Sequence, residues 1–233
     1  MTAQPLQPAQ PEPSEVPKPT PPHTLWMMAG GEVTLLPVDL DSGLQRGVIT
    51  HWLTGAAGLI VTIGVRTSRE AAAMCSGQRV WMSGREAADE ELIVLEVIAR
   101  RASDQDDTTL ILTGVLPLAR ERRRSAVRAA TRHPATVTYP DGTTAKGVAT
   151  DLSHGGCRID LNQPDLVRSV GATAEVRIEL PDHKKFVLTA VIMRIDMQTG
   201  ELGMRFEPTE LDLAPIDRLV YATVKRQKIT EEY

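Results

Sequence analysis

The chain has 233 residues and a formal net charge of −4 at pH 7, with 42% hydrophobic and 24% charged residues, which is typical of a soluble globular protein with one large or two small domains. Its two cysteines, Cys75 and Cys157, lie far apart, which excludes a disulfide framework and zinc-binding spacing and fits a reducing cytosol. The N-terminus has no signal-peptide pattern, and no apolar run has the ~18 residues that a membrane span needs, so we expect a cytoplasmic protein.

The first 29 residues are predicted to be a disordered, proline-rich tail. Residues 1–22 contain 8 of the 16 prolines and almost no large hydrophobic side chains. Such a segment cannot offset the entropy of ordering by burying apolar surface, so we expect a solvated extension that is partly polyproline II. Recognition of this tail by a partner is the alternative.

A first series of β-strands is predicted within residues 30–117. Runs rich in Val, Ile and Leu lie at 31–38, 47–53, 58–65, 78–84 and 108–118. The segment 90–101, "EELIVLEVIARR", fits a helix or a strand, and the strands on both sides of it favour a strand. This spacing predicts a small antiparallel barrel or sandwich.

A basic connector is expected at 118–132, and a second series of strands follows it. The strand patterns lie at 133–140, 145–153, 156–161, 171–180, 186–196 and 199–207. They predict a second antiparallel barrel, so the expected fold class is all-β. The chain then continues into a C-terminal helix whose apolar stripe we expect to pack on this barrel, with a partner or second copy as the alternative. The stripe consists of Ile216, Leu219, Val220, Thr223 and Val224.

Two short segments are candidates for a binding site. The segment "RERRRSAVR", Arg120–Arg128, holds five arginines in nine residues. A guanidinium is planar and permanently charged, so it can bind two phosphate oxygens or the O6 and N7 atoms of guanine. The second segment, "DLSHGG", comprises residues 151–156. It offers a carboxylate acceptor, a hydroxyl donor, and glycines that allow positive φ and a close approach of backbone to a ligand.

Together the two segments resemble the motifs of the PilZ domain family, which are receptors for the bacterial second messenger cyclic di-GMP. Arg124-x-x-x-Arg128 matches the first motif, and Asp151-x-Ser153-x-x-Gly156 matches the second. The late segment "ELGMRFE" and the terminal helix also look like parts of that family. The strand-rich region upstream is similar to the YcgR-type arrangement, in which an N-terminal split barrel precedes the PilZ barrel. The resemblance thus implies a YcgR-like domain at 30–117 and a six-stranded PilZ barrel within 118–233.

The resemblance also implies roles for individual residues. Arg124 and Arg128 would clamp guanine and phosphate, and the Asp-Ser-Gly turn would complete the pocket. Arg123 would contact the ligand or a second, stacked copy of it, whereas His154 is expected to be a surface residue. The expected ligand-binding set is Arg123, Arg124, Arg128, Asp151, Ser153, Gly155 and Gly156.

The expected mechanism follows from the position of the arginines between the two barrels. Ligand would fold a flexible connector onto the second barrel, fix the angle between the domains and create a surface for an effector protein. The resemblance implies flagellar motor, secretion or synthase complexes as effectors, with motility or exopolysaccharide synthesis as the output, and the YcgR-like layout favours motility. The protein itself would be a monomer or a homodimer.

Other functions stay open from the residues alone. The arginine run also fits a nucleic-acid or polyanion binder, although a net acidic chain with 3% aromatics is poorly suited to this role. A PilZ domain that serves as a scaffold without ligand is a further alternative. We find no nucleophile with a base, no phosphate-binding loop and no metal-binding histidine pair, so we predict neither an enzyme nor a metal or cofactor site.

Overall fold

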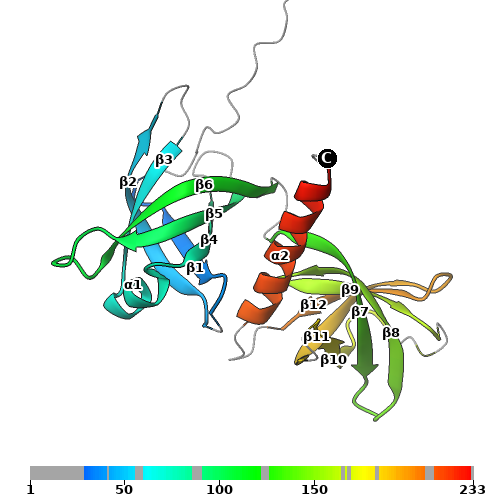
Figure 1. The fold of residues 1–233 in the computed structure, drawn as a ribbon. Helices are drawn as coiled ribbons and strands as arrows, with labels where there is room; N and C mark the ends of the chain where they lie inside the picture. Colours follow the sequence, from blue (N-terminus) through cyan, green and yellow to red (C-terminus); the bar gives the residue numbers. More distant parts are fainter. Residues whose placement is uncertain are drawn as a thin grey trace, which may run out of the picture.

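A computed structural model describes residues 29–40, 42–55, 60–85, 91–121, 126–163, 166, 169–181, 184–207 and 213–231. All but the last residue of the predicted proline-rich tail lies outside this set. Two closed barrels of six antiparallel strands make up most of the described structure, with a long helix near the C-terminus (Figure 1). The predicted fold class, two antiparallel barrels followed by a helix, is confirmed.

The first barrel is closed in the strand order β1-β2-β3-β6-β5-β4. The ambiguous segment at 90–101 forms strand β5, as the strands on either side of it predicted. Its strands are β1 (Glu32–Pro37), β2 (Gln45–Thr54), β3 (Ile60–Thr67), β4 (Arg79–Arg85), β5 (Leu92–Arg101) and β6 (Thr109–Glu121).

A short helix, α1 (Arg69–Cys75), interrupts the first barrel between β3 and β4, where the sequence analysis predicted only strands. Ser68 caps it, because its Oγ accepts a hydrogen bond from the backbone N–H of Ala71 at 3.1 Å. Ala71, Ala72 and Cys75 are buried. Seven residues are too few to show a helical period, and only the serine cap signals this helix in the sequence.

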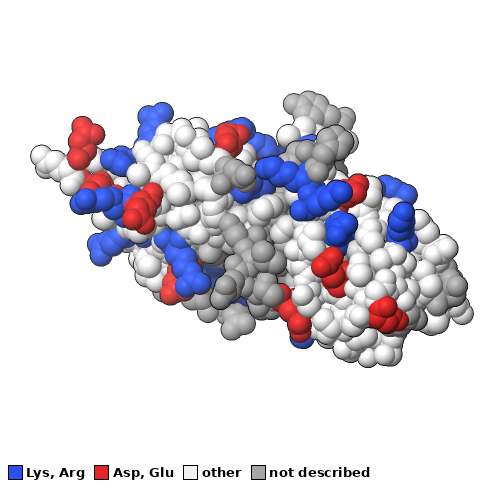
Figure 2. All heavy atoms as spheres, turned by 90° about the horizontal axis from the view of Figure 1, so that it is seen from below, with Lys and Arg blue, Asp and Glu red and all other residues white. Residues whose placement is uncertain are grey.

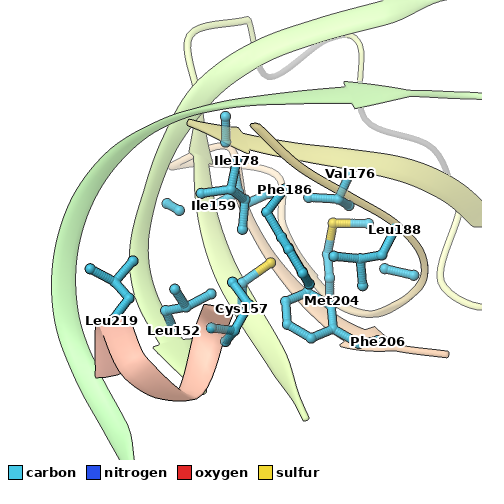
Figure 3. Close-up of a cluster of buried hydrophobic side chains, with 14 of the residues drawn as sticks. Leu152, Cys157, Ile159, Val176, Ile178, Phe186, Leu188, Met204, Phe206 and Leu219 are labelled. Atoms are coloured by element: carbon cyan, nitrogen blue, oxygen red, sulfur yellow. The ribbon is translucent and has the colours of Figure 1, made fainter. Parts of the chain in front are cut away.

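The second barrel is closed in the order β10-β11-β12-β9-β8-β7. Its strands are β7 (Arg128–Thr138), β8 (Thr144–Ser153), β9 (Gly156–Leu161), β10 (Thr173–Glu179), β11 (Lys185–Asp196) and β12 (Glu201–Phe206). Side chains alternate between solvent and core along β10, as expected for strands with one buried face. Figure 3 shows Cys157, Phe186 and Met204 gathered in the core of this barrel.

The segment between the barrels is shorter than the connector predicted at 118–132. Strand β6 continues to Glu121, which pairs with Leu92, and β7 already begins at Arg128. Strand β6 continues because Leu118 is only 2% exposed and joins the apolar cluster between the barrels. The basic composition predicted an exposed connector, but strand pairing uses the backbone and tolerates arginines on the outer face.

Helix α2 (Ala214–Glu231) lies between the two barrels (Figure 1). Its residues Ile216, Leu219 and Val220 are buried in a cluster that includes the core of the second barrel. The same cluster contains Trp81 and Leu118 of the first barrel. The helix therefore packs on its own barrel, as predicted, and also joins that barrel to the first one. Within the part of the chain that is described, no helix is long and apolar enough to cross a bilayer.

Candidate ligand-binding site

Strand pairing brings the two sequence motifs into one row across the second barrel. Arg128 at the start of β7 pairs with Ser153 at the end of β8. Ser153 in turn pairs with Gly156 at the start of β9, and Gly156 pairs with Arg205 on β12. Arg128 and Ser153, which are 25 positions apart in the sequence, thus lie side by side on neighbouring strands. The residues that separate Arg128 from Asp151 in the sequence form the β7–β8 hairpin.

The direction of Arg128 follows from its apolar neighbours. Val127 and Ala129 are 4% and 1% exposed, so both side chains point into the core. The alternation of a β-strand then places the Arg128 side chain on the outer face, where about half of it is exposed. Arg128 therefore belongs to a strand of the barrel, whereas the sequence analysis placed it on a flexible connector.

A β-bulge turns Asp151 toward the same outer face. Ala149 and Leu152 both point into the core, although they lie three positions apart, which a strict period of two does not permit. The register between β8 and β9 accordingly shifts between Ala149 and Asp151. As a result Asp151 Oδ2 lies 3.4 Å from Nη1 of Arg128 and accepts a hydrogen bond from it. Asp151 thus orients the guanidinium of the first motif.

Ser153 stabilises the turn between β8 and β9. Its side chain is 6% exposed, and its hydroxyl donates a hydrogen bond to the carbonyl oxygen of Gly156 at 3.1 Å. The hydroxyl donor that the sequence offered thus has a backbone carbonyl of its own turn as its partner. Ser153 consequently fixes the shape of the pocket wall.

The two glycines of the turn do not use the positive φ that glycine allows. The described glycines with positive φ do not include Gly155 or Gly156. A Cβ on Gly156 would instead collide with the carbonyl oxygen of Met204 on β12, whereas a Cβ on Gly155 would meet no atom within 4 Å. Gly156 is therefore needed because β9 and β12 approach closely at this point.

A pocket of about 490 Å³ opens beside this row of residues. Arg128, Ser153, Gly155 and Gly156 of the predicted set line it, and Asp151 reaches it through its ion pair with Arg128. Further lining residues come from β9, β11 and β12 and were missed from the sequence, namely Arg158, Met193, Arg194, Glu201 and Arg205. They lie at outward positions of three separate strands. Their proximity depends on how those strands pair, which the sequence alone did not reveal.

The electrostatic character of the pocket is basic. Its lining contains four arginines and one carboxylate, that of Glu201, which lies 3.5 Å from Nη1 of Arg158. Permanently charged guanidiniums facing one hollow favour a ligand with more than one negative charge. The thiol of Cys157 at the pocket wall is not a reactive group, because burial, followed by the nearby charge of Asp151, raises its pKa to about 12.

His154 is an exposed residue, as the sequence analysis expected, but it also has a specific partner. Its Nδ1 lies 3.0 Å from Oδ2 of Asp217 in the first turn of α2. The hydrogen bond to Asp217 raises the pKa of His154, and burial opposes this shift.

Arg123 and Arg124 lie outside the described residues, so their part in the site stays a prediction.

The face of the molecule drawn in Figure 2 carries charges of both signs. Lysine and arginine side chains are interspersed there with aspartate and glutamate side chains. Phe186 and Phe206 are 8% and 4% exposed, so neither offers a ring for stacking on nucleic-acid bases. These features disfavour the polyanion-binding alternative. Among the described residues, no group of three His, Cys, Asp or Glu side chains is arranged to hold a metal ion.

The second half of the chain is thus a six-stranded antiparallel barrel domain with a basic pocket beside its Asp-Ser-Gly turn. Residues 122–222 match the family model described as the PilZ domain. These residues form a PilZ domain, and the resemblance indicated by the two motifs is confirmed. No curated protein matches the chain.

Several solved structures are similar to the chain. YcgR from Escherichia coli in complex with c-di-GMP is 14% identical, with 88% of each chain covered and a TM-score of 0.40. The inhibitor of motility MotI/DgrA from Bacillus subtilis is 15% identical, and the match covers 86% of this chain and 98% of that one, with a TM-score of 0.37. The PilZ domain of CeSA from a cellulose-synthesizing bacterium is 27% identical, and the match covers 41% and 95%, with a TM-score of 0.35.

Proposed function

We propose that this protein is a receptor for cyclic di-GMP and acts by binding rather than by catalysis. The observation that carries the proposal is the pocket in which Arg128, the Asp-Ser-Gly turn and three further arginines meet on a PilZ barrel. A cyclic dinucleotide with two phosphates and two guanines offers both kinds of acceptor pair that a guanidinium recognises.

The roles of individual residues follow from their positions. Arg128, held by Asp151, presents its guanidinium to a phosphate or to the Hoogsteen edge of guanine. Arg124, four residues earlier in the segment between the barrels, supplies the second guanidinium of the motif, and Arg123 contacts the same ligand or a second copy. Gly155 carries no side chain, and the ligand can therefore approach its backbone closely.

Signalling in this proposal depends on the short segment that joins β6 to β7. A ligand bound to both Arg124 and the barrel pocket joins this segment to the barrel and shifts the population of domain arrangements. The altered surface is then recognised by a protein effector, with motility or exopolysaccharide output as the process controlled. The chain would work in the cytoplasm, where cyclic dinucleotides are made.

Calorimetric titration of the full chain with cyclic di-GMP, GTP and cyclic di-AMP tests the proposal. Cyclic di-GMP should bind more tightly than the other two nucleotides. Arg124→Ala and Arg128→Ala each remove charge-assisted hydrogen bonds worth ~1.5–3 kcal/mol, and each should weaken binding about 10- to 100-fold. Arg177→Ala is the matched control, because Arg177 is an exposed arginine on β10 away from the pocket lining.

Two results would contradict the assignment. One is an affinity of both motif variants within about twofold of the unmodified protein, since charge-assisted contacts would then be absent. The other is equal affinity for all three nucleotides with a steep dependence on salt, which is the behaviour of a general polyanion binder.

A further inference from the structure

The Asp-Ser-Gly turn is attached directly to helix α2. His154, in the middle of this turn, has Nδ1 3.1 Å from Oδ1 and 3.0 Å from Oδ2 of Asp217. The carboxylate of Asp217 is nearly inaccessible, since the residue is 3% exposed. A buried carboxylate requires a polar partner, and the imidazole of His154 fills this role.

Beyond Asp217, α2 contacts the first barrel as well as the second. One turn after Asp217, the ring of Tyr221 contacts Trp81 of β4 edge-on, with ring centroids 5.6 Å apart. Nε1 of Trp81 donates to Oε2 of Glu96 at 3.0 Å, and Nζ of Lys225 donates to Oε1 of the same carboxylate at 2.6 Å.

Arg218 adds a polar contact to the first barrel next to Asp217 in the sequence. Its guanidinium donates to the backbone carbonyl oxygens of Pro37 and Ser42. Along one helix, therefore, Asp217 binds the ligand-site turn while Arg218, Tyr221 and Lys225 bind the other domain. The helix is a rigid element that touches both the pocket wall and the domain interface.

We propose that His154 and Asp217 are positioning residues that couple the ligand-site turn to α2, so that occupancy of the pocket changes how α2 and the first barrel meet. This inference rests on the proposed receptor function. The Ser153 hydrogen bond to the Gly156 carbonyl oxygen joins the two ends of the turn, so we expect the turn to move as a unit. A shift of the turn on ligand binding is thus passed to Asp217 and, through the helix, to the contacts around Trp81 and Glu96.

The test measures the distance between the barrels and the affinity for ligand in the same variants. Spin labels are placed at Asp104→Cys in the first barrel and Lys146→Cys in the second, both exposed positions. The native Cys75 and Cys157 are buried and will not compete for the label. Electron–electron distance distributions are recorded for the full chain with and without saturating cyclic di-GMP, in parallel with calorimetry.

Three variants separate coupling from folding and from ligand contact. His154→Ala and Asp217→Asn disrupt the ion pair, whereas His154→Asn keeps an N–H donor near the position of Nδ1. Ligand should shift the distance distribution of the unmodified protein and of His154→Asn. His154→Ala and Asp217→Asn should still bind cyclic di-GMP, with affinity changed less than about tenfold, and should lose the ligand-induced shift.

Each other outcome overturns the inference. If His154→Ala and Asp217→Asn show the full shift at saturation, the pair does not transmit the signal. If the unmodified protein binds cyclic di-GMP without any shift, the receptor function holds and the coupling fails. If the unmodified protein does not bind cyclic di-GMP, the proposed function itself fails, and the inference falls with it.

Discussion

Lys225 of α2 and Glu96 of the first barrel form an ion pair across the junction of the two domains, with Nζ and Oε1 2.6 Å apart. Glu96 is 9% exposed and also accepts a hydrogen bond from the indole of Trp81. Side chains from the two domains thus satisfy one another around the buried Glu96 carboxylate, while Lys225 is partly exposed. The junction contains a specific polar network within an apolar cluster, and this fixes how the helix sits on the first barrel.

Replacing Lys225 tests that network. Lys225→Met keeps the apolar stem but leaves a largely buried carboxylate without its counter-charge, so we expect a loss of ~1–3 kcal/mol in unfolding free energy. Lys228→Met is the control, because Lys228 is exposed and donates to the carbonyl oxygen of Pro117 rather than to a buried carboxylate. Chemical denaturation should show a change within ~0.5 kcal/mol for this control. Equal losses in the two variants would show that the buried ion pair has no special role.

The two adjacent glycines of the turn are predicted to respond differently to the same substitution. Gly156→Ala forces a methyl group against the carbonyl oxygen of Met204 and should destabilise the second barrel by ~1–3 kcal/mol. Gly155→Ala meets open space and should change stability by less than ~0.5 kcal/mol. Thermal unfolding of both variants checks this contrast, and a more destabilising Gly155→Ala would refute the explanation of the motif glycine given by the structure.

The strand pattern of the sequence was sufficient to predict both barrels, because runs rich in Val, Ile and Leu recur at short, regular spacing along both halves of the chain. Helix α1 escaped prediction, since its seven residues are shorter than the window in which a helical period becomes visible. The place of α2 between the barrels was only half predicted. Its apolar stripe indicated packing on the second barrel, but the contact of Tyr221 with Trp81 depends on two segments 140 residues apart.

Those residues of the candidate site that belong to the two local motifs could be predicted from the sequence. Arg128, Ser153 and Gly156 lie together because β7, β8 and β9 are consecutive hairpin strands. The arginines of β11 and β12 carry no local signature, and their place in the pocket depends on the closure of the barrel. The structural reason for a glycine at position 156 could not be predicted from the sequence either. The atom that excludes a side chain there is the carbonyl oxygen of Met204, on another strand.

The additional arginines of the pocket should contribute to ligand affinity. Arg205→Gln removes one positive charge from a hollow with four guanidiniums while keeping much of the side-chain volume, so we expect cyclic di-GMP to bind about 3- to 10-fold more weakly. Arg177→Gln removes the same charge from β10, outside the pocket lining, and should leave the affinity nearly unchanged. Calorimetry at two salt concentrations distinguishes direct contact in the pocket from long-range electrostatic attraction. Long-range attraction would lower the affinity of both variants for cyclic di-GMP by the same factor.

Stability should depend on pH through His154. Its pKa in the folded protein is raised above the ordinary value of 6.5 by the hydrogen bond to Asp217, so the folded state holds the proton more tightly than the unfolded chain. The ion pair therefore stabilises the fold fully below the unfolded pKa, and this contribution is lost as the pH rises through the raised, folded-state pKa.

Unfolding free energies of the unmodified protein and of His154→Asn, measured from about pH 5 to about pH 8.5, isolate this effect. The advantage of the unmodified protein should shrink toward high pH. His133 acts in the opposite direction, since burial, followed by the charge of Arg226, lowers its pKa, and its contribution cancels in the difference between the two proteins. A difference that stays constant over the whole range would show that His154 is not protonated preferentially in the folded state.

Both native thiols should be inert until the protein unfolds. Burial raises the pKa of Cys75 to about 11, and burial together with the charge of Asp151 raises that of Cys157 to about 12. Only the thiolate attacks a disulfide reagent, and at about pH 8 its fraction is then ~10⁻³ or less for each residue. An aromatic disulfide reagent should therefore react slowly with the folded protein and rapidly with both cysteines in denaturant. Fast release of one equivalent under native conditions would mean that one of these strands opens to solvent.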